Sequence, residues 1–395
     1  MSIRLLLILF YLFSALIVFW VLNITNNYGA AVRYREVGNS DELFANFIYG
    51  VVFVYATIFT IFKLITFRKV KFVQLNKLVV LDAFLLLSII INLFTLKAGI
   101  GKAGGEMSSI GFLQSIIPLI PLISFYYISV RDSITKQRIV LILASLVIGI
   151  LKGWSGHLIV IVLLEVMYRF GERKISLKDI FKLFFAFSIV VFLFYFIVAL
   201  KFYIRSGHYQ TMLLYEYMQY VFGRTSYFAT FNYILEVGEP LSEIIKDDRG
   251  MLFFIQEFFL GVVPKSIFGL SDFRFMDNIY SVNFIDSNLP NAGFSITLPG
   301  LYVISWYINN DFIFLTLFLV SIFYLQWCLM NVFNPTASKD LLLVNILLFC
   351  SSGSLKEIAL FTYTLLSFLI FYMVFSFIIP FKKRFNNKIY EVNAV

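Results

Sequence analysis

The sequence predicts an all-α, polytopic integral membrane protein with about ten, and up to about twelve, transmembrane helices and one large external loop. Three observations lead to this fold class. Hydrophobic residues make up 60% of the 395 residues, and the mean hydropathy is +0.88. The apolar residues form many runs close to the roughly 20 residues that cross a hydrocarbon core. Most charged residues lie between these runs.

The apolar runs give the expected transmembrane helices in chain order. The first run, 5–22, has no small-x-small cleavage site and is followed by further runs, so we interpret it as a helix and not as a signal peptide. The fifth and sixth segments are short, and they could form one long tilted helix. The spans are expected at 4–24, 45–66, 78–96, 110–130, 139–151, 157–169, 183–200, 312–332, 341–355 and 358–380.

The distribution of lysine and arginine predicts the topology, because these residues prefer the cytoplasmic side in short loops. With ten crossings and both termini in the cytoplasm, the cytoplasmic segments carry about +14. A single crossing over 139–169 would place the basic segment 171–179 outside. We therefore expect two short helices that meet at an external turn, 152–157. The net charge of +9 then follows from topology and does not indicate nucleic-acid binding.

This topology divides the chain into three parts. Residues 1–200 form an N-terminal bundle of about seven spans, residues 201–311 form a large periplasmic loop, and residues 312–395 hold the last spans and a cytoplasmic tail. Two apolar stretches within the loop, 251–263 and 294–308, predict interfacial or re-entrant helices. The alternative is that they form two further crossings. The spans show no repeat of two similar halves, which weighs against a secondary transporter.

Few charges lie within the spans, where each costs about 2.5–3.5 kcal/mol at mid-bilayer. Glu165 precedes Arg169 by four residues, which predicts an ion pair on one helix face. Asp82 follows Lys77 near the same surface, which predicts an interfacial pair or a cap. Ion-coupled transport therefore has little support. The histidines and cysteines lack metal-ligand spacing, so we expect no metal and no cofactor.

Cations gather on the predicted external side, which is otherwise acidic. Guanidinium groups bind phosphate through a bidentate fork without a metal. Tyrosines such as Tyr209 can stack on sugars, so the pattern favours a lipid-linked phosphate or pyrophosphate that carries sugars. The alternative is that these residues anchor the interface or pair with Glu216, Glu236 or Asp272. The cations are Lys152, His157, Arg205, His208, Arg224, Arg249, Lys265 and Arg274.

The stretch 204–225 holds the strongest candidates of this set. Arg224 lies at a glycine turn that opens a predicted helix, where free N–H groups can also bind an anion. Arg205 directly follows the span that ends near residue 200. His208 and Glu216 are the nearest candidates for a general base.

The layout resembles the Wzy-type O-antigen polymerases, which are related more distantly to the O-antigen ligases. The resemblance covers nearly the full length, from the number of spans and the short external turn to the single large loop. Gly223 and Arg224 before an aromatic-rich helix are similar to the loop arginine of the family. The segments 263–269 and 291–303 are similar to its proline-serine segment and its glycine-rich return into the membrane.

The resemblance implies a GT-C-like, metal-independent glycosyltransferase in a bacterial inner membrane. It would polymerise undecaprenyl-pyrophosphate-linked oligosaccharide units into O-antigen or a similar surface polysaccharide, with membrane lipid and a chain-length regulator protein as partners. A flippase or exporter of lipid-linked oligosaccharide, and an O-antigen ligase, are the alternatives. Arg224 and Arg205 would neutralise the departing pyrophosphate, and His208 or Glu216 would serve as base. The remaining contacts to pyrophosphate or glycan would come from Arg274, Lys265, Arg249, Lys152, His157 and Tyr209.

Overall fold

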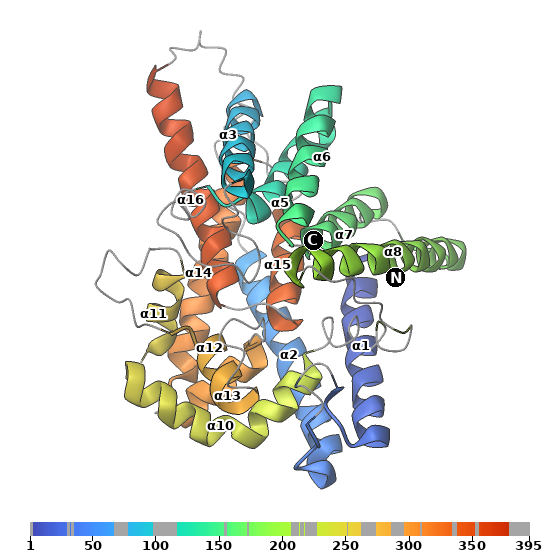
Figure 1. Ribbon diagram of the computed structural model, residues 1–395, viewed down its shortest axis with the longest axis vertical. Helices are drawn as coiled ribbons and strands as arrows, with labels where there is room; N and C mark the ends of the chain where they lie inside the picture. Colours follow the sequence, from blue (N-terminus) through green and yellow to red (C-terminus); the bar gives the residue numbers. More distant parts are fainter. Residues whose placement is uncertain are drawn as a thin grey trace.

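The computed structural model describes residues 3–29, 32, 35–66, 78–97, 117–153, 156–171, 174–206, 213, 217, 227–250, 252–261, 274–285, 296–308, 310–333, 338–351 and 355–378. Every regular element in these residues is a helix, and the one strand-like pairing is an isolated bridge between Asn27 and Glu36. The prediction of an all-α fold is therefore confirmed (Figure 1).

Six helices in the described residues are long and apolar enough to cross a membrane. Each coincides with a span expected from hydropathy, and each is apolar around most of its circumference, as lipid-facing helices are. The transmembrane character is thus supported, whereas the total of ten to twelve crossings stays a prediction. The six helices are α1 (Ile3–Thr25), α2 (Leu43–Thr66), α3 (Leu78–Lys97), α8 (Leu177–Ser206), α14 (Phe312–Phe333) and α16 (Leu355–Ile378).

Four shorter helices occupy the remaining predicted spans. They hold 12 to 16 residues, which at about 1.5 Å per residue is less than a full crossing. The prediction of two separate helices around residues 152–157 is confirmed, because one helix ends at Leu151 and the next begins at Gly156. The four are α5 (Leu119–Val130), α6 (Lys136–Leu151), α7 (Gly156–Phe170) and α15 (Ser338–Ser351).

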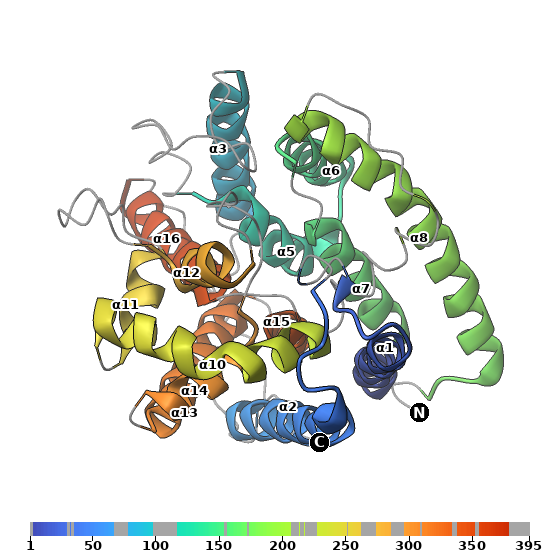
Figure 2. The same ribbon diagram turned by 60° about the horizontal axis from the view of Figure 1, so that its bottom comes forward.

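Helix α8 lies at the edge of the molecule, as Figure 2 shows. Only 6% of its most apolar stretch is buried inside the protein, and most of its phenylalanine side chains are exposed. It contacts the bundle at α6 and through an edge-to-face pair of Phe187 with Phe10 of α1. Near its end, Val198 is buried and the hydroxyl of Tyr217 donates to the carbonyl of Val191 at 2.6 Å. An apolar helix with so little protein cover is suited to contact with lipid.

The described part of the predicted loop is also helical. It contains α10 (Phe228–Arg249), α11 (Phe253–Leu260), α12 (Met276–Tyr280), which continues as a π turn to Ile285, and α13 (Leu298–Tyr307). Figure 1 shows these helices in the lower left part of the view, with one end of α10 beside α2. Helices α11 and α13 have 8 and 10 residues, which is too short for a crossing.

Helices α10 and α13 cross closely because glycine lies at the contact on each of them. A Cβ atom on Gly300 would lie 2.5 Å from Cδ1 of Ile234, and one on Gly238 would lie 3.0 Å from Cγ1 of Val303. Helix α10 also packs on α1 and α2. Contacts with α13 and with α1 and α2 therefore determine which face of α10 meets the connection between α1 and α2. This connection contains the short helix η2 (Ser40–Glu42).

Candidate functional site

The structure describes only part of the site expected from the sequence. Arg205 belongs to the last turn of α8, where the backbone alone is described. Arg274, Arg249, Lys152 and His157 are described with their side chains. The other expected residues lie outside the described part of the chain and stay predictions: Arg224, His208, Tyr209, Glu216 and Lys265.

Arg249 and Arg274 have contrasting surroundings. Arg274 is exposed just before α12. Arg249 is buried at the end of α10, and its Nη1 forms an ion pair with Oε2 of Glu257 in α11. Glu257 also accepts the backbone N–H of Met276 at 3.1 Å. The pair thus joins α10, α11 and the start of α12, which gives Arg249 a structural contact in place of the open position expected for a ligand-binding cation.

Lys152 is buried in the turn after α6, with 4% of its surface exposed. Its Nζ donates to Oδ1 of Asn92 at 2.8 Å and to Oγ1 of Thr95 at 2.9 Å, both on α3. No carboxylate in the described ranges lies within ion-pair distance of this amine. Burial without a negative partner lowers the pKa of Lys152 to about 8.

His157 lies close to Lys152 in the chain, in the first turn of α7, and it is also buried. Its ring packs against Gly149 of α6, where a Cβ atom would lie 2.6 Å from Nε2. The turn between α6 and α7 therefore brings its two basic residues into the protein interior. Because the side chains of Lys152 and His157 are both buried, neither can contact a ligand at the protein surface.

A polar cluster that the sequence analysis did not identify lies where α10 meets the α1–α2 connection. We call it the α10 cluster. Asn232 and Tyr233 lie four and three residues before Glu236, so each of them neighbours Glu236 on the surface of α10. The cluster consists of Tyr28, Arg35, Asn39, Asn46, Asn232, Tyr233, Glu236 and Tyr280.

Arg35 supplies the cation of the α10 cluster. Its Nη1 donates to the hydroxyl of Tyr233 at 2.7 Å, and its Nη2 donates to the carbonyl of Ile285 at 3.3 Å. The guanidinium carbon lies 5.7 Å from the centre of the Tyr233 ring, and the residue is exposed. Within the part of the chain that is described, no carboxylate lies in ion-pair range of Arg35.

Glu236 supplies the anion of the cluster. Its Oε1 accepts three hydrogen bonds from the α1–α2 connection, from the hydroxyl of Tyr28, from N–H of Gly38 at 3.0 Å and from N–H of Asn39 at 3.3 Å. Asn232 reinforces the contact by donating to Oδ1 of Asn39 at 2.9 Å. These bonds hold the carboxylate in one position on α10.

Three tyrosines fill the space around these charges. The Tyr28 and Tyr233 rings meet edge to face at 5.4 Å between centroids, and Tyr280 lies 6.1 Å from Tyr233. Burial raises the pKa of all three, so they are neutral hydroxyl donors. The buried hydroxyl of Tyr280 has no hydrogen-bond partner among the described residues. Such an unsatisfied group at a polar cluster is compatible with a ligand contact.

The signal for Arg35 was present in the sequence. Arg33 and Arg35 lie between the first two spans, in a segment predicted to be external, where lysine and arginine are usually depleted. The same rule drew attention to Arg224. What the sequence does not contain is the pairing of Arg35 with Tyr233, because these residues are 198 positions apart.

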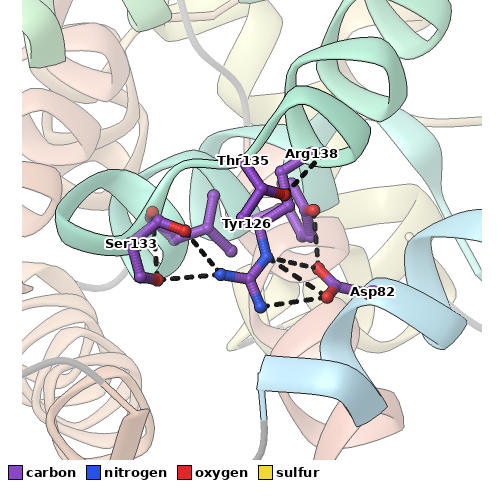
Figure 3. Close-up of polar contacts among 6 residues, drawn as sticks. Asp82, Tyr126, Ser133, Thr135 and Arg138 are labelled. Atoms are coloured by element: carbon purple, nitrogen blue, oxygen red, sulfur yellow. Dashed lines mark hydrogen bonds and ion pairs between the residues drawn. The ribbon is translucent and has the colours of Figure 1, made fainter.

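The ion pairs elsewhere in the bundle join helices. Figure 3 shows Arg138 of α6 against Asp82 of α3, with Nη2 and Oδ2 3.1 Å apart and the hydroxyl of Tyr126 donating to Asp82 at 2.7 Å. The same guanidinium donates to the carbonyl of Ser133 at 2.6 Å. Asp82 therefore forms an ion pair, with Arg138 as its described partner. Lys77, the partner suggested by the sequence, lies outside the described residues.

Glu165 of α7 has two arginine partners. The predicted pair with Arg169 is confirmed, with 2.6 Å between Nε and Oε1. Arg131, in the short helix η3 (Arg131–Ser133), adds a second pair at 2.8 Å. Glu165 is thus neutralised within the protein and joins α7 to the end of α5.

Among the described sites, the α10 cluster offers the most varied set of groups for binding a ligand. It combines an arginine free of carboxylate contacts in the described chain, a positioned carboxylate, and neutral tyrosine and asparagine side chains. Such groups can bind a phosphate and the hydroxyls of sugars. No known protein family, curated protein or solved structure matches the chain.

Proposed function

We propose that the chain is a membrane glycosyltransferase that polymerises polyprenyl-pyrophosphate-linked oligosaccharide units at the outer face of a bacterial inner membrane. The observation that carries the proposal is the setting of Arg35. Arg35 is an exposed residue whose guanidinium is held by Tyr233 and the carbonyl of Ile285, outside ion-pair range of every described carboxylate. An arginine held in this way keeps its charge and donors for a phosphate group.

The reaction requires charge stabilisation at the leaving group. An acceptor hydroxyl attacks the anomeric carbon of the donor glycan, and the bond to the pyrophosphate oxygen breaks with its electron pair. Arg35 neutralises the charge that develops on that oxygen, which lowers the barrier electrostatically. Arg224 and Arg205 are proposed as further cations for the same pyrophosphate, and Tyr209, Arg274 and Lys265 as further contacts.

The distribution of charges favours group transfer over export. Among the described residues, Asp82 and Glu165 lie within predicted spans, and both are neutralised by arginines. At the α10 cluster, where α10 meets the α1–α2 connection, Arg35 and Glu236 have no such ion pair with a described residue. A ligase would use the same donor chemistry, and it differs from a polymerase only in the acceptor that receives the glycan.

The proposal predicts that long surface glycan depends on Arg35. Arg35→Ala, expressed in the source bacterium without its chromosomal copy, should leave glycans of single repeat units. Arg35→Lys keeps the charge but loses the fork, so it should give short chains. Arg224→Ala and Arg224→Lys are expected to behave likewise. Chain length is read from a gel of extracted polysaccharide at equal protein level.

A matched control is Arg169→Ala, because Arg169 is also exposed but pairs with Glu165 away from the α10 cluster. It should make glycan of normal length. Long chains in both Arg35 variants would refute the role of Arg35. Long chains in all four arginine variants would remove the basis of the proposed function.

A further inference from the structure

We infer that Glu236 is the general base that removes the proton from the acceptor hydroxyl, an assignment that rests on the proposed function. The sequence pattern favours His208 or Glu216 as the base, and it suggests Glu236 only as a partner for arginine. The structure places its carboxylate on the same face of α10 as Tyr233, which holds the guanidinium of Arg35.

The hydrogen bonds of Glu236 leave one of its oxygens available. Oε1 carries the three bonds from Tyr28, Gly38 and Asn39, whereas Oε2 has no hydrogen-bond partner among the described residues. The residue is partly exposed. One oxygen thus positions the carboxylate, and the other can accept a proton from a bound hydroxyl.

The separation of Glu236 from Arg35 is the second part of the argument. Elsewhere in the described chain, several acids pair directly with arginine, as in Arg249–Glu257 and Arg131–Glu165. In the α10 cluster the charges are linked through tyrosines instead, since Arg35 contacts Tyr233 and Glu236 contacts Tyr28. The rings of Tyr28 and Tyr233 pack against each other. Each charge therefore remains available for its own part of a ligand.

Glu236 and Arg35 can serve the acceptor and the leaving group of one substitution at the anomeric carbon. The acceptor oxygen forms a bond to the anomeric carbon, and its proton passes to Oε2 of Glu236. The bond from the anomeric carbon to the pyrophosphate breaks, and the electron pair leaves with the pyrophosphate oxygen beside Arg35. The proton on Glu236 then passes to water, which restores the carboxylate. No oxidant, reductant or further reactant is needed.

Glu236→Gln separates a catalytic role from a structural one. The amide oxygen of glutamine can still accept the bonds from Tyr28, Gly38 and Asn39, but it cannot act as a base. Purified full-length protein in lipid nanodiscs would be supplied with the lipid-linked repeat unit extracted from the source bacterium. The rate of polymer formation should fall by about 100-fold or more, with an unchanged thermal unfolding midpoint. A rate within about threefold of the wild type would overturn the inference.

The pH profile supplies a readout that a structural role would not change. The wild-type rate should fall at low pH, because a general base acts only in its deprotonated form, and Glu236→Asp should keep this acid limb at a lower rate. The residual rate of Glu236→Gln should lack it. An unchanged acid limb in Glu236→Gln would contradict the inference, even if the variant were slow or less stable.

Arg35→Ala in the same preparation distinguishes the two proposals. If Arg35→Ala abolishes polymer formation and Glu236→Gln does not, the proposed function stands and another group is the base. If the wild-type protein makes no polymer from the repeat unit, the proposed function itself fails.

Discussion

Arg249 and Arg35 both belong to segments predicted to lie outside the membrane, yet their neighbours differ. Arg249 is buried against Glu257, whereas Arg35 is exposed beside Tyr233. The sequence pattern treats them alike, because residue type and predicted side are the same. Tertiary packing decides which arginine meets a carboxylate, so the sequence pattern does not distinguish the buried Arg249 from the exposed Arg35. Only the short-range pair of Glu165 and Arg169 could be predicted directly.

Lys152 gives a prediction at the residue scale. Its pKa of about 8 lies below the ordinary value of 10.5, so the folded state favours the neutral amine. The cost of the charged form is fully present below pH 8 and is relieved as the pH rises toward 10.5. Relative to Lys152→Met, the wild-type free energy of unfolding should therefore rise by about 2 kcal/mol between pH 7 and pH 10.

Thermal unfolding midpoints of both proteins in the same detergent, measured across this pH range, check the prediction. The comparison with Lys152→Met removes the contribution of other titrating groups. A difference between the two midpoints that stays constant with pH would show that the amine of Lys152 has an ordinary pKa in the folded protein.

At the scale of elements, hydropathy predicted the positions of the helices more accurately than their lengths. The six long helices match expected spans because a run of about 20 apolar residues has few alternatives to a membrane helix. The boundary expected between the spans 341–355 and 358–380 lies a few residues earlier, since α15 ends at Ser351 and α16 begins at Leu355. Hydropathy averages over several residues, so it places the boundary between two adjacent apolar helices only approximately.

Contact between α6 and α7 gives a prediction at this scale. A methyl group on Gly149 would overlap the His157 ring, so Gly149→Ala should cost about 1–3 kcal/mol. Gly156→Ala is the matched control, because nothing lies within 4 Å of its Cβ position. Thermal unfolding midpoints provide the measurement.

The double variant Gly149→Ala/His157→Ala tests the cause of the effect. Removing the ring should recover part of the lost stability, because the methyl group then has space. If Gly149→Ala were as harmless as Gly156→Ala, the close packing of the two helices at this point would be wrong.

At the scale of the whole molecule, the most important contact is the one between α10, in the predicted loop, and the connection between α1 and α2. Asn232 and Glu236 reach residues near 39, about 190 to 200 positions earlier in the chain. Hydropathy contains no information about this contact, since it depends on the crossing of α10 with α13 at Gly238 and Gly300. The general location of a polar site in the loop could be predicted, but its partner segment could not.

Reconstitution of the whole protein measures the central claim most directly. Wild-type protein and Arg35→Ala, each alone in liposomes, would receive the extracted lipid-linked repeat unit on the side of the α1–α2 connection. The account predicts a ladder of covalently longer glycans on the lipid with the wild type, and no ladder with Arg35→Ala. Single repeat units that only change leaflet, or an equal ladder with Arg35→Ala, would contradict it.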